Sequence, residues 1–132
     1  MQRLERRLVY PDMPVSLVVD DEPSVRRYVS AILQRENFTT LEAEDGSHGL
    51  QIVQERDGDL DLIVSDIQMP KMDGVTFAHA VKHSFPALPV ILVSGYAEAD
   101  AGFEFVEKPF SPGALLKAVR NVLARKTSKN SK

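Results

Sequence analysis

The stretches Val15–Glu22, VSLVVDDE, and Leu60–Asp66, LDLIVSD, are each rich in apolar residues and end in carboxylates. Short runs rich in apolar residues are typical of strands buried on both faces of a parallel sheet. Five such runs predict five strands: Val15–Val19, Phe38–Leu41, Leu60–Val64, Val90–Val93 and Phe103–Val106. The two quoted stretches decide the fold, because they predict buried strands that end in acidic residues.

Segments with helical spacing lie between these runs. In Pro23–Glu36, apolar residues recur at i, i+4, i+7 and i+8, and Pro23 suits the first turn of a helix. The other predicted helices are Gly46–Glu55, Asp73–His83 and Ser111–Ala124. This alternation predicts an α/β fold with a doubly wound, five-stranded parallel sheet.

The fourth crossover is the exception to the alternation. Only SGYAEADAG, residues 94–102, separates the fourth predicted strand from the fifth. A connection of this length holds about one turn of helix. We therefore expect the fourth helix to be very short or absent.

Composition and charge exclude several classes of protein. The 132 residues correspond to one domain and contain no cysteine, which excludes disulfides, thiolate metal sites and a cysteine nucleophile. Without the +2 of residues 1–7 and the +4 of residues 125–132, the net charge of −3 becomes −9 for residues 8–124. An acidic body argues against nucleic-acid binding. No apolar run reaches the roughly 18 residues of a membrane span, so we expect no membrane insertion and a cytoplasmic location.

Polar residues follow the predicted strands at one edge of the sheet. Asp20, Asp21 and Glu22 follow the first strand, and Asp66 follows the third. Ser94 follows the fourth strand and Lys108 the fifth. Clustered carboxylates repel one another unless a cation lies among them, and an oxygen-only ligand set favours Mg²⁺. A carboxylate beside Mg²⁺, an ammonium and a hydroxyl has the groups that phosphoryl transfer requires.

Four motifs carry these residues: VVDDEP (18–23), IVSDIQMPKMDG (63–74), VILVSGY (90–96) and VEKPF (106–110). In order and spacing they resemble the receiver domain of two-component response regulators, which has a flavodoxin-like, CheY-like (βα)₅ fold. The resemblance covers residues 15–125. It leaves 1–14 as an N-terminal extension and 126–132 as a basic, flexible tail.

The resemblance implies a role for each matching residue. Asp66 would be the phospho-acceptor, receiving the phosphoryl group from a histidine kinase or phosphotransfer protein. Asp20, Asp21, Asp66 and the backbone carbonyl of Gln68 would bind Mg²⁺.

The same resemblance implies how the phosphoryl group is sensed. Lys108 and Ser94 would each hold a phosphoryl oxygen, and Phe105 would be the aromatic residue that switches with Ser94. The Lys108–Pro109 peptide bond would be cis. Such a domain is not an enzyme beyond self-phosphotransfer and autodephosphorylation.

We expect a downstream protein target and a monomer or weak dimer, since the reduced fourth helix alters a common dimerisation face of the family. Two alternatives stay open: the receiver segment of a hybrid histidine kinase and a phosphorylation-independent scaffold. A Mg²⁺-dependent phosphohydrolase is disfavoured, because no Asp-x-Asp directly follows the first strand. His79 and His83 have zinc-compatible i, i+4 spacing, but we expect surface histidines.

Overall fold

The computed structural model describes residues 13–95 and 102–130, with only the backbone of residues 126–130. Its five strands are β1 (Val15–Val19), β2 (Thr39–Ala43), β3 (Leu62–Asp66), β4 (Val90–Ser94) and β5 (Glu104–Glu107). They form one sheet in the order β2-β1-β3-β4-β5, and every neighbouring pair is parallel. The predicted five-stranded parallel sheet is confirmed.

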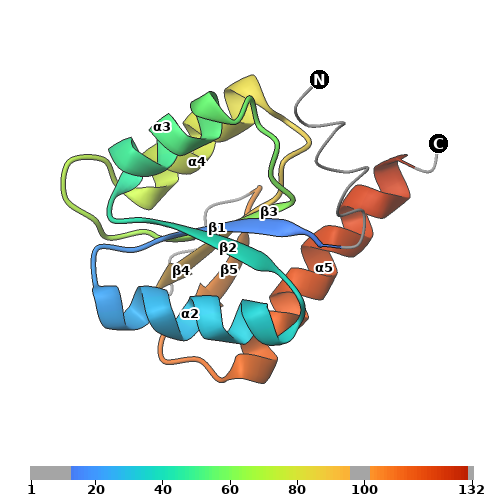
Figure 1. Cartoon of the computed structure of the whole chain (residues 1–132), viewed down its shortest axis with the longest axis horizontal. Helices are drawn as coiled ribbons and strands as arrows, with labels where there is room; N and C mark the ends of the chain where they lie inside the picture. The colour runs from blue at the N-terminus through green and yellow to red at the C-terminus, as the bar shows by residue number, and fades with distance from the viewer. Residues whose placement is uncertain (1–12, 96–101, 131–132) are drawn as a thin grey trace.

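Helices cover both faces of this sheet (Figure 1). One face carries α2 (Pro23–Arg35) and α5 (Pro112–Asn130), and the other carries α3 (Gly46–Glu55) and α4 (Gly74–Ser84). Each face has its own cluster of buried apolar side chains. The arrangement is the predicted doubly wound α/β fold.

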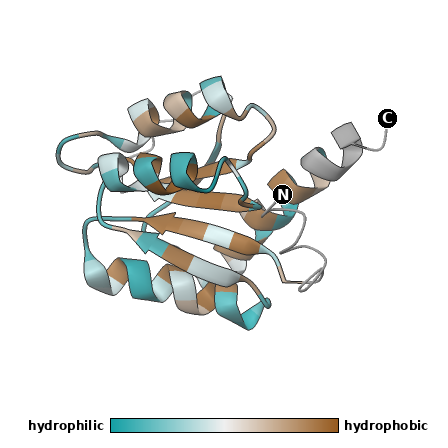
Figure 2. Ribbon diagram, turned by 45° about the horizontal axis from the view of Figure 1, so that its top comes forward, coloured by the Kyte–Doolittle hydropathy of each residue, from teal (hydrophilic) through white to brown (hydrophobic). Residues whose placement is uncertain are grey.

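The inner strands are mostly apolar, as the hydropathy colouring shows (Figure 2), and their polar residues are Ser16, Ser65, Asp66 and Ser94. Every residue of β1, β3 and β4 is buried. Successive side chains of a strand point to opposite faces, so Val18 packs with α2 and α5 while Leu17 packs with α3 and α4. A high density of apolar residues was therefore a sound predictor for these three strands.

The edge strands begin and end later than predicted. β2 spans Thr39–Ala43 and β5 spans Glu104–Glu107, each shifted toward the C-terminus. Both strands lie at a sheet edge and are partly exposed, so their apolar residues do not form a continuous run. Phe38 is 7% exposed and packs in the core without joining the ladder.

The predicted start of β3 at Leu60 is also too early. Leu60 is buried but precedes the strand, and the Asp61 carboxylate accepts a hydrogen bond of 2.7 Å from the backbone N–H of Val15. Burial and strand pairing are separate properties here. Asp66 and Ser94, expected just after their strands, are instead the last residues of β3 and β4.

Side-chain caps fix the starts of three helices. Asp45 and Asp73 accept hydrogen bonds of 2.8 Å from the N–H groups of His48 and Thr76, and the Ser111 hydroxyl accepts one of 3.1 Å from Ala114.

The last helix is longer than predicted. It continues past Ala124 to Asn130 and so includes part of the segment expected as a tail. No glycine or proline interrupts residues 125–130, and cationic residues are favourable in a final helical turn. No helix in the described ranges is long and apolar enough to span a membrane.

The connection between β4 and β5 is nine residues long, from Gly95 to Phe103. This length agrees with the expectation of a very short or missing fourth crossover helix. Its central residues, 96–101, lie outside the described residues.

Ser16 is a buried polar residue of β1, and within the described part of the chain its hydroxyl has no hydrogen-bond partner. We predict that Ser16→Ala raises the free energy of unfolding by about 1 kcal/mol, because it removes an unsatisfied group with little change in volume. Urea denaturation followed by circular dichroism measures the change. Ser30→Ala is the control and should destabilise, because the Ser30 hydroxyl is buried and donates to Glu42. A fall in the free energy for Ser16→Ala contradicts the prediction.

Candidate functional site

The candidate site lies where the strand order reverses. From β1 the chain builds one side of the sheet through β2 and the other through β3, β4 and β5. In open parallel sheets, ligands bind beyond the carboxyl ends of strands at such a point. Asp20 directly follows β1, and Asp66 ends the neighbouring strand β3.

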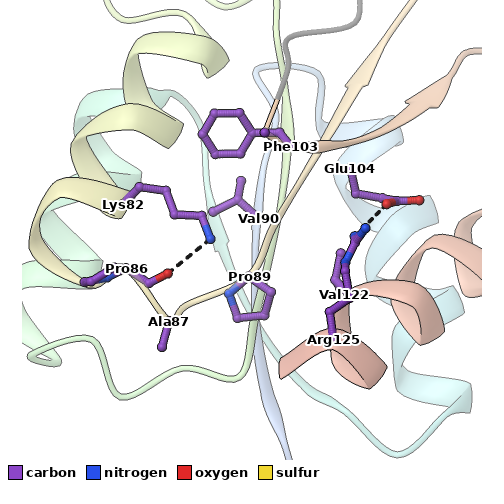
Figure 3. Close-up of a pocket in the computed structure, with 10 residues that line it drawn as sticks. Lys82, Pro86, Ala87, Pro89, Val90, Phe103, Glu104, Val122 and Arg125 are labelled. Atoms are coloured by element: carbon purple, nitrogen blue, oxygen red, sulfur yellow. Dashed lines mark hydrogen bonds and ion pairs between the residues drawn. The ribbon is translucent and has the colours of Figure 1, made fainter. Parts of the chain in front are cut away.

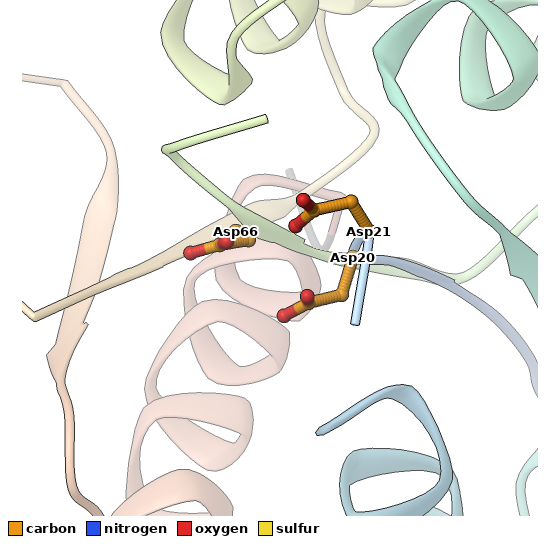
Figure 4. A group of neighbouring side chains, drawn as sticks. All are labelled: Asp20, Asp21 and Asp66. Carbon is orange, nitrogen blue, oxygen red and sulfur yellow. The ribbon is translucent and has the colours of Figure 1, made fainter. Parts of the chain in front are cut away.

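Three aspartates meet at this edge of the sheet (Figure 4). Asp20, Asp21 and Asp66 each offer one carboxylate oxygen such that the three oxygens lie within 4.8 Å of one another. Asp20 is 3% exposed and Asp66 is 6% exposed, whereas Asp21 is exposed to solvent. The predicted convergence of these three side chains is therefore observed.

Lys108 brings a positive charge to the two buried carboxylates. Its Nζ lies 3.3 Å from Oδ1 of Asp66 and 3.7 Å from Oδ2 of Asp20. The backbone N–H of Lys108 donates to the carbonyl of Ser94 at 2.7 Å, which ties the residue to the end of β4. The Lys108–Pro109 peptide bond is cis, as the resemblance implies.

Burial sets the protonation of the two inner carboxyls. It raises the pKa of Asp20 to about 6, and the nearby Asp66 adds to the rise, while the N–H of Glu22 and the Lys108 ammonium oppose it. Burial likewise raises the pKa of Asp66 against the effect of Lys108. One ammonium is thus insufficient to hold both buried carboxyls at their ordinary pKa.

The donor set fits Mg²⁺. Asp20, Asp21 and Asp66 provide hard oxygen ligands on one side of a partly open site, and Mg²⁺ binds through a few carboxylates while keeping several waters. A divalent cation would also offset the burial and the repulsion between carboxylates that together raise the pKa of Asp20.

A glycine allows α4 to begin against the end of β3. A Cβ placed on Gly74 would lie 2.1 Å from the carbonyl oxygen of Asp66, closer than any side chain permits. The N–H of Gly74 donates to the carbonyl of Ile67 at 2.7 Å. The loop after Asp66 is therefore held tightly over the site.

The remaining predicted site residues are Ser94 in β4, Phe105 in β5 and Gln68 in the loop after β3. Ser94 is buried at the end of β4, beside β3 in the sheet. Phe105 lies within β5, half-buried against the α3 and α4 face. Gln68 is exposed in the loop two residues after Asp66. The metal contact of its carbonyl and the switching of Phe105 stay predictions.

Sequence reasoning missed one contact and misjudged another. Arg26 of α2 donates from Nη1 to the carbonyl of Asp20 at 2.7 Å, and no motif pointed to it. Glu22, expected among the acidic residues of the site, contributes its backbone N–H to Oδ1 of Asp20 at 2.9 Å and is not in the carboxylate cluster. An arginine on the first turns of the helix after the acidic loop was the available signal.

A hollow of about 330 Å³ lies at the amino ends of β4 and β5 and is lined by residues such as Lys82, Glu104 and Arg125 (Figure 3). Its polar side chains bond to nearby groups: Glu104 pairs with Arg125 at 2.7 Å, and Lys82 donates to the carbonyl of Pro86 at 3.3 Å.

The zinc hypothesis for His79 and His83 gains no support. His79 packs edge-on against Phe103, with ring centroids 5.2 Å apart. In the ranges that the structure describes, the aspartate cluster is the one group of three or more potential metal ligands.

Comparison with known families identifies the class of protein. The family model of the response regulator receiver domain matches residues 16–120. The chain therefore belongs to the receiver-domain family of two-component signalling proteins.

Individual relatives agree with this assignment. The chain is 39% identical over 117 residues to sensor kinase CckA of Brucella abortus (strain 2308), covering 83% of this chain and 12% of CckA. It is 34% identical to the transcriptional regulatory protein ResD of Bacillus subtilis (strain 168), covering 83% of this chain and 48% of ResD. The chain thus spans less than half the length of either relative.

A solved structure is similar over nearly the whole domain. The response regulator TrrA of Thermotoga maritima, in complex with Mg²⁺ and BeF, matches with a TM-score of 0.75 and 30% identity. The match covers 84% of this chain and all of TrrA (100%).

The raised pKa of Asp20 predicts how stability depends on pH without divalent cations. The folded state binds this proton more tightly than the unfolded chain, whose pKa is near 3.8. The stabilisation is therefore complete at low pH and is lost as pH rises through about 6. In chelator, we predict that wild type loses about 2–3 kcal/mol of unfolding free energy relative to Asp20→Asn between about pH 4 and pH 7.

Urea titrations at each pH measure this difference, because the amide of Asp20→Asn cannot ionise. Saturating Mg²⁺ at neutral pH should reduce it, since cation binding stabilises the wild type. A difference that does not change with pH contradicts the prediction.

Proposed function

We propose that this receiver domain accepts a phosphoryl group on Asp66 from a histidine kinase or phosphotransfer protein and passes the signal to a protein target. The observation that carries the proposal is the ammonium of Lys108, which lies 3.3 Å from Asp66 and 3.7 Å from Asp20 at the end of the central strands. Membership of the receiver family supports the same conclusion.

Asp66 is the nucleophile in the proposed transfer. One of its carboxylate oxygens forms a bond to phosphorus while the P–N bond of the phosphohistidine breaks. The electrons of that bond stay on the imidazole nitrogen, which takes up a proton. Lys108 Nζ, already beside Asp66 Oδ1, pairs with a phosphoryl oxygen and offsets its charge.

The three aspartates would hold Mg²⁺, with the carbonyl of Gln68 as a further ligand. Bound Mg²⁺ supplies charge neutralisation for the phosphoryl oxygens. The fit of the oxygen donors and the Mg²⁺–BeF complex of TrrA support this assignment.

Ser94 and Phe105 are proposed to carry the response. Ser94 ends β4 beside β3, and its carbonyl accepts the N–H of Lys108, so a group bound to Asp66 acts on both β4 and β5. The hydroxyl of Ser94 would bond a phosphoryl oxygen, and Phe105 would repack in response. Phosphorylation then shifts a pre-existing equilibrium between two conformations.

The surface beside Lys108 suits a protein phosphodonor. A hollow of about 520 Å³ is lined by Val25, Tyr28, Pro109 and Phe110 together with Lys108. Tyr28 is 43% exposed, and its hydroxyl donates to the carbonyl of Phe110 at 3.0 Å. An apolar docking surface next to the acceptor would orient a phosphohistidine toward Asp66.

The second candidate is a relay role, in which the phosphoryl group moves from Asp66 to another histidine. The identity with CckA, a sensor kinase, favours it. In either role we propose action in the cytoplasm, where the kinases and phosphotransfer proteins of two-component signalling would supply the phosphoryl group.

We predict that wild type incubated with acetyl phosphate and Mg²⁺ gains the mass of one phosphoryl group and that Asp66→Asn gains none. The amide of Asp66→Asn keeps the shape of the side chain but lacks the nucleophilic oxygen. Intact-mass spectrometry makes the measurement, and Asp73→Asn is the control for loss of an exposed carboxylate outside the cluster. A full increment on Asp66→Asn excludes Asp66 as the acceptor, and no increment on wild type favours a phosphorylation-independent scaffold.

Lys108→Ala should bind Mg²⁺ at least as well as wild type, because it removes a cation that competes for Asp20 and Asp66. Its conformational response to Mg²⁺ and beryllofluoride should be largely lost. Calorimetry measures Mg²⁺ binding, and hydrogen exchange at β4 and β5 measures the response. Lys117→Ala, at an exposed position of α5, should respond like wild type. A full response in Lys108→Ala would exclude the proposed contact.

A further inference from the structure

Arg26 of α2 links the residue that follows β1, Asp20, to Glu42 of β2. Its Nη1 donates to the backbone carbonyl of Asp20 at 2.7 Å, and its Nε donates to the Glu42 carboxylate at 3.1 Å. The guanidinium thus joins the end of β1 to β2 from its position on α2. The side chain of Arg26 is only 17% exposed, and its bond to the Asp20 carbonyl is partly buried, whereas the Glu42 side chain is 37% exposed.

Glu42 is itself held in place. Its second carboxylate oxygen accepts a hydrogen bond of 3.0 Å from the hydroxyl of Ser30, which is 3% exposed. Both oxygens of Glu42 are therefore engaged by α2, one through Arg26 and one through Ser30. The planar guanidinium presents donors in fixed directions, which suits two acceptors at once.

The hydrogen bonds of Asp20 show which groups the Arg26 side chain keeps in place. Its N–H donates to the carbonyl of Ala43 at 3.1 Å, its carbonyl accepts from Arg26, and its carboxylate accepts from the N–H of Glu22. The peptide group that carries the Asp20 carbonyl also joins Asp20 to Asp21. Fixing that carbonyl therefore fixes the direction in which Asp21 leaves the strand.

We propose that Arg26 is a positioning residue for the divalent-cation site: it orients the Asp20–Asp21 peptide through Glu42 and presets the two carboxylates for Mg²⁺. The inference rests on the proposed function, since it assigns a supporting contact to the same site. Groups that orient metal ligands in this way commonly change affinity by about 10–100-fold when they are removed.

Removal of Arg26 should change the affinity for Mg²⁺ in opposite directions, depending on whether Arg26 acts through its charge or by positioning the ligands. This difference makes the inference testable. The guanidinium is a cation close to an acidic cluster, so its removal would strengthen Mg²⁺ binding if it acted only through charge. Loss of positioning instead weakens binding. The sign of the change in affinity therefore separates the two roles.

The experiment is a Mg²⁺ titration of the full chain by calorimetry, together with the rate of phosphorylation by acetyl phosphate. We expect Arg26→Gln to bind Mg²⁺ about tenfold more weakly and to phosphorylate more slowly at subsaturating Mg²⁺. Excess Mg²⁺ should restore its rate. Arg26→Lys keeps the positive charge but lacks the planar guanidinium that donates to two acceptors at once. The Mg²⁺ affinity of this variant should therefore also fall. Arg27→Gln, an equal change of charge at an exposed neighbour, should bind no more weakly than wild type.

Glu42→Gln provides a second route, because it weakens the anchor and leaves the charge of Arg26 in place. Its affinity should fall, and adding Arg26→Gln should have less effect than in wild type. Circular dichroism first confirms that each variant is folded. If Arg26→Gln is not folded, the Mg²⁺ affinity of Glu42→Gln tests the inference instead.

If Arg26→Gln binds Mg²⁺ as tightly as wild type or more tightly, the inference is overturned but the proposed function is not. The same holds if Arg26→Lys binds Mg²⁺ as tightly as wild type. A wild type that neither binds Mg²⁺ nor gains a phosphoryl group overturns the proposed function and this inference together.

Discussion

Two carboxyl groups are buried side by side at the ends of neighbouring parallel strands, and the rest of the site depends on how their charge is offset. Removing an ionised carboxylate from water costs several kcal/mol unless an opposite charge compensates. Lys108 supplies one positive charge for both Asp20 and Asp66. The remaining negative charge, joined by Asp21 at the surface, would attract a cation. The charge that destabilises the metal-free site is therefore the same charge that would favour a bound metal ion.

Much of the fold could be predicted because three strands are buried on both faces. In β1, β3 and β4 most positions carry an apolar side chain, and the sequence displays this directly; the polar exceptions are Ser16, Ser65, Asp66 and Ser94. The edge strands β2 and β5 carry less information, because one side of each faces solvent or a connection. The extra turns of α5 were missed because polar residues without glycine or proline are compatible with either helix or tail.

The central site residues could be predicted for a different reason. Parallel strands end at one edge of the sheet, so residues that follow separate apolar runs must meet there. That argument located Asp20, Asp66 and Lys108. It could not find the link from Arg26 to Glu42, which depends on how α2 is rotated over β2 and on the register of β2 against β1. Contacts between side chains of different elements are set by packing that no local pattern records.

The full burial of β1 also restricts how the chain can change in length. Its five residues alternate between two separate cores, with Val18 in one and Leu17 in the other. Loss of a single residue would exchange the two sets of side chains and turn Asp20 toward the opposite layer of helices. Insertions and deletions should therefore be tolerated best in connections such as the nine residues between β4 and β5. For β1, conserving the number of residues matters more than conserving which apolar residues they are.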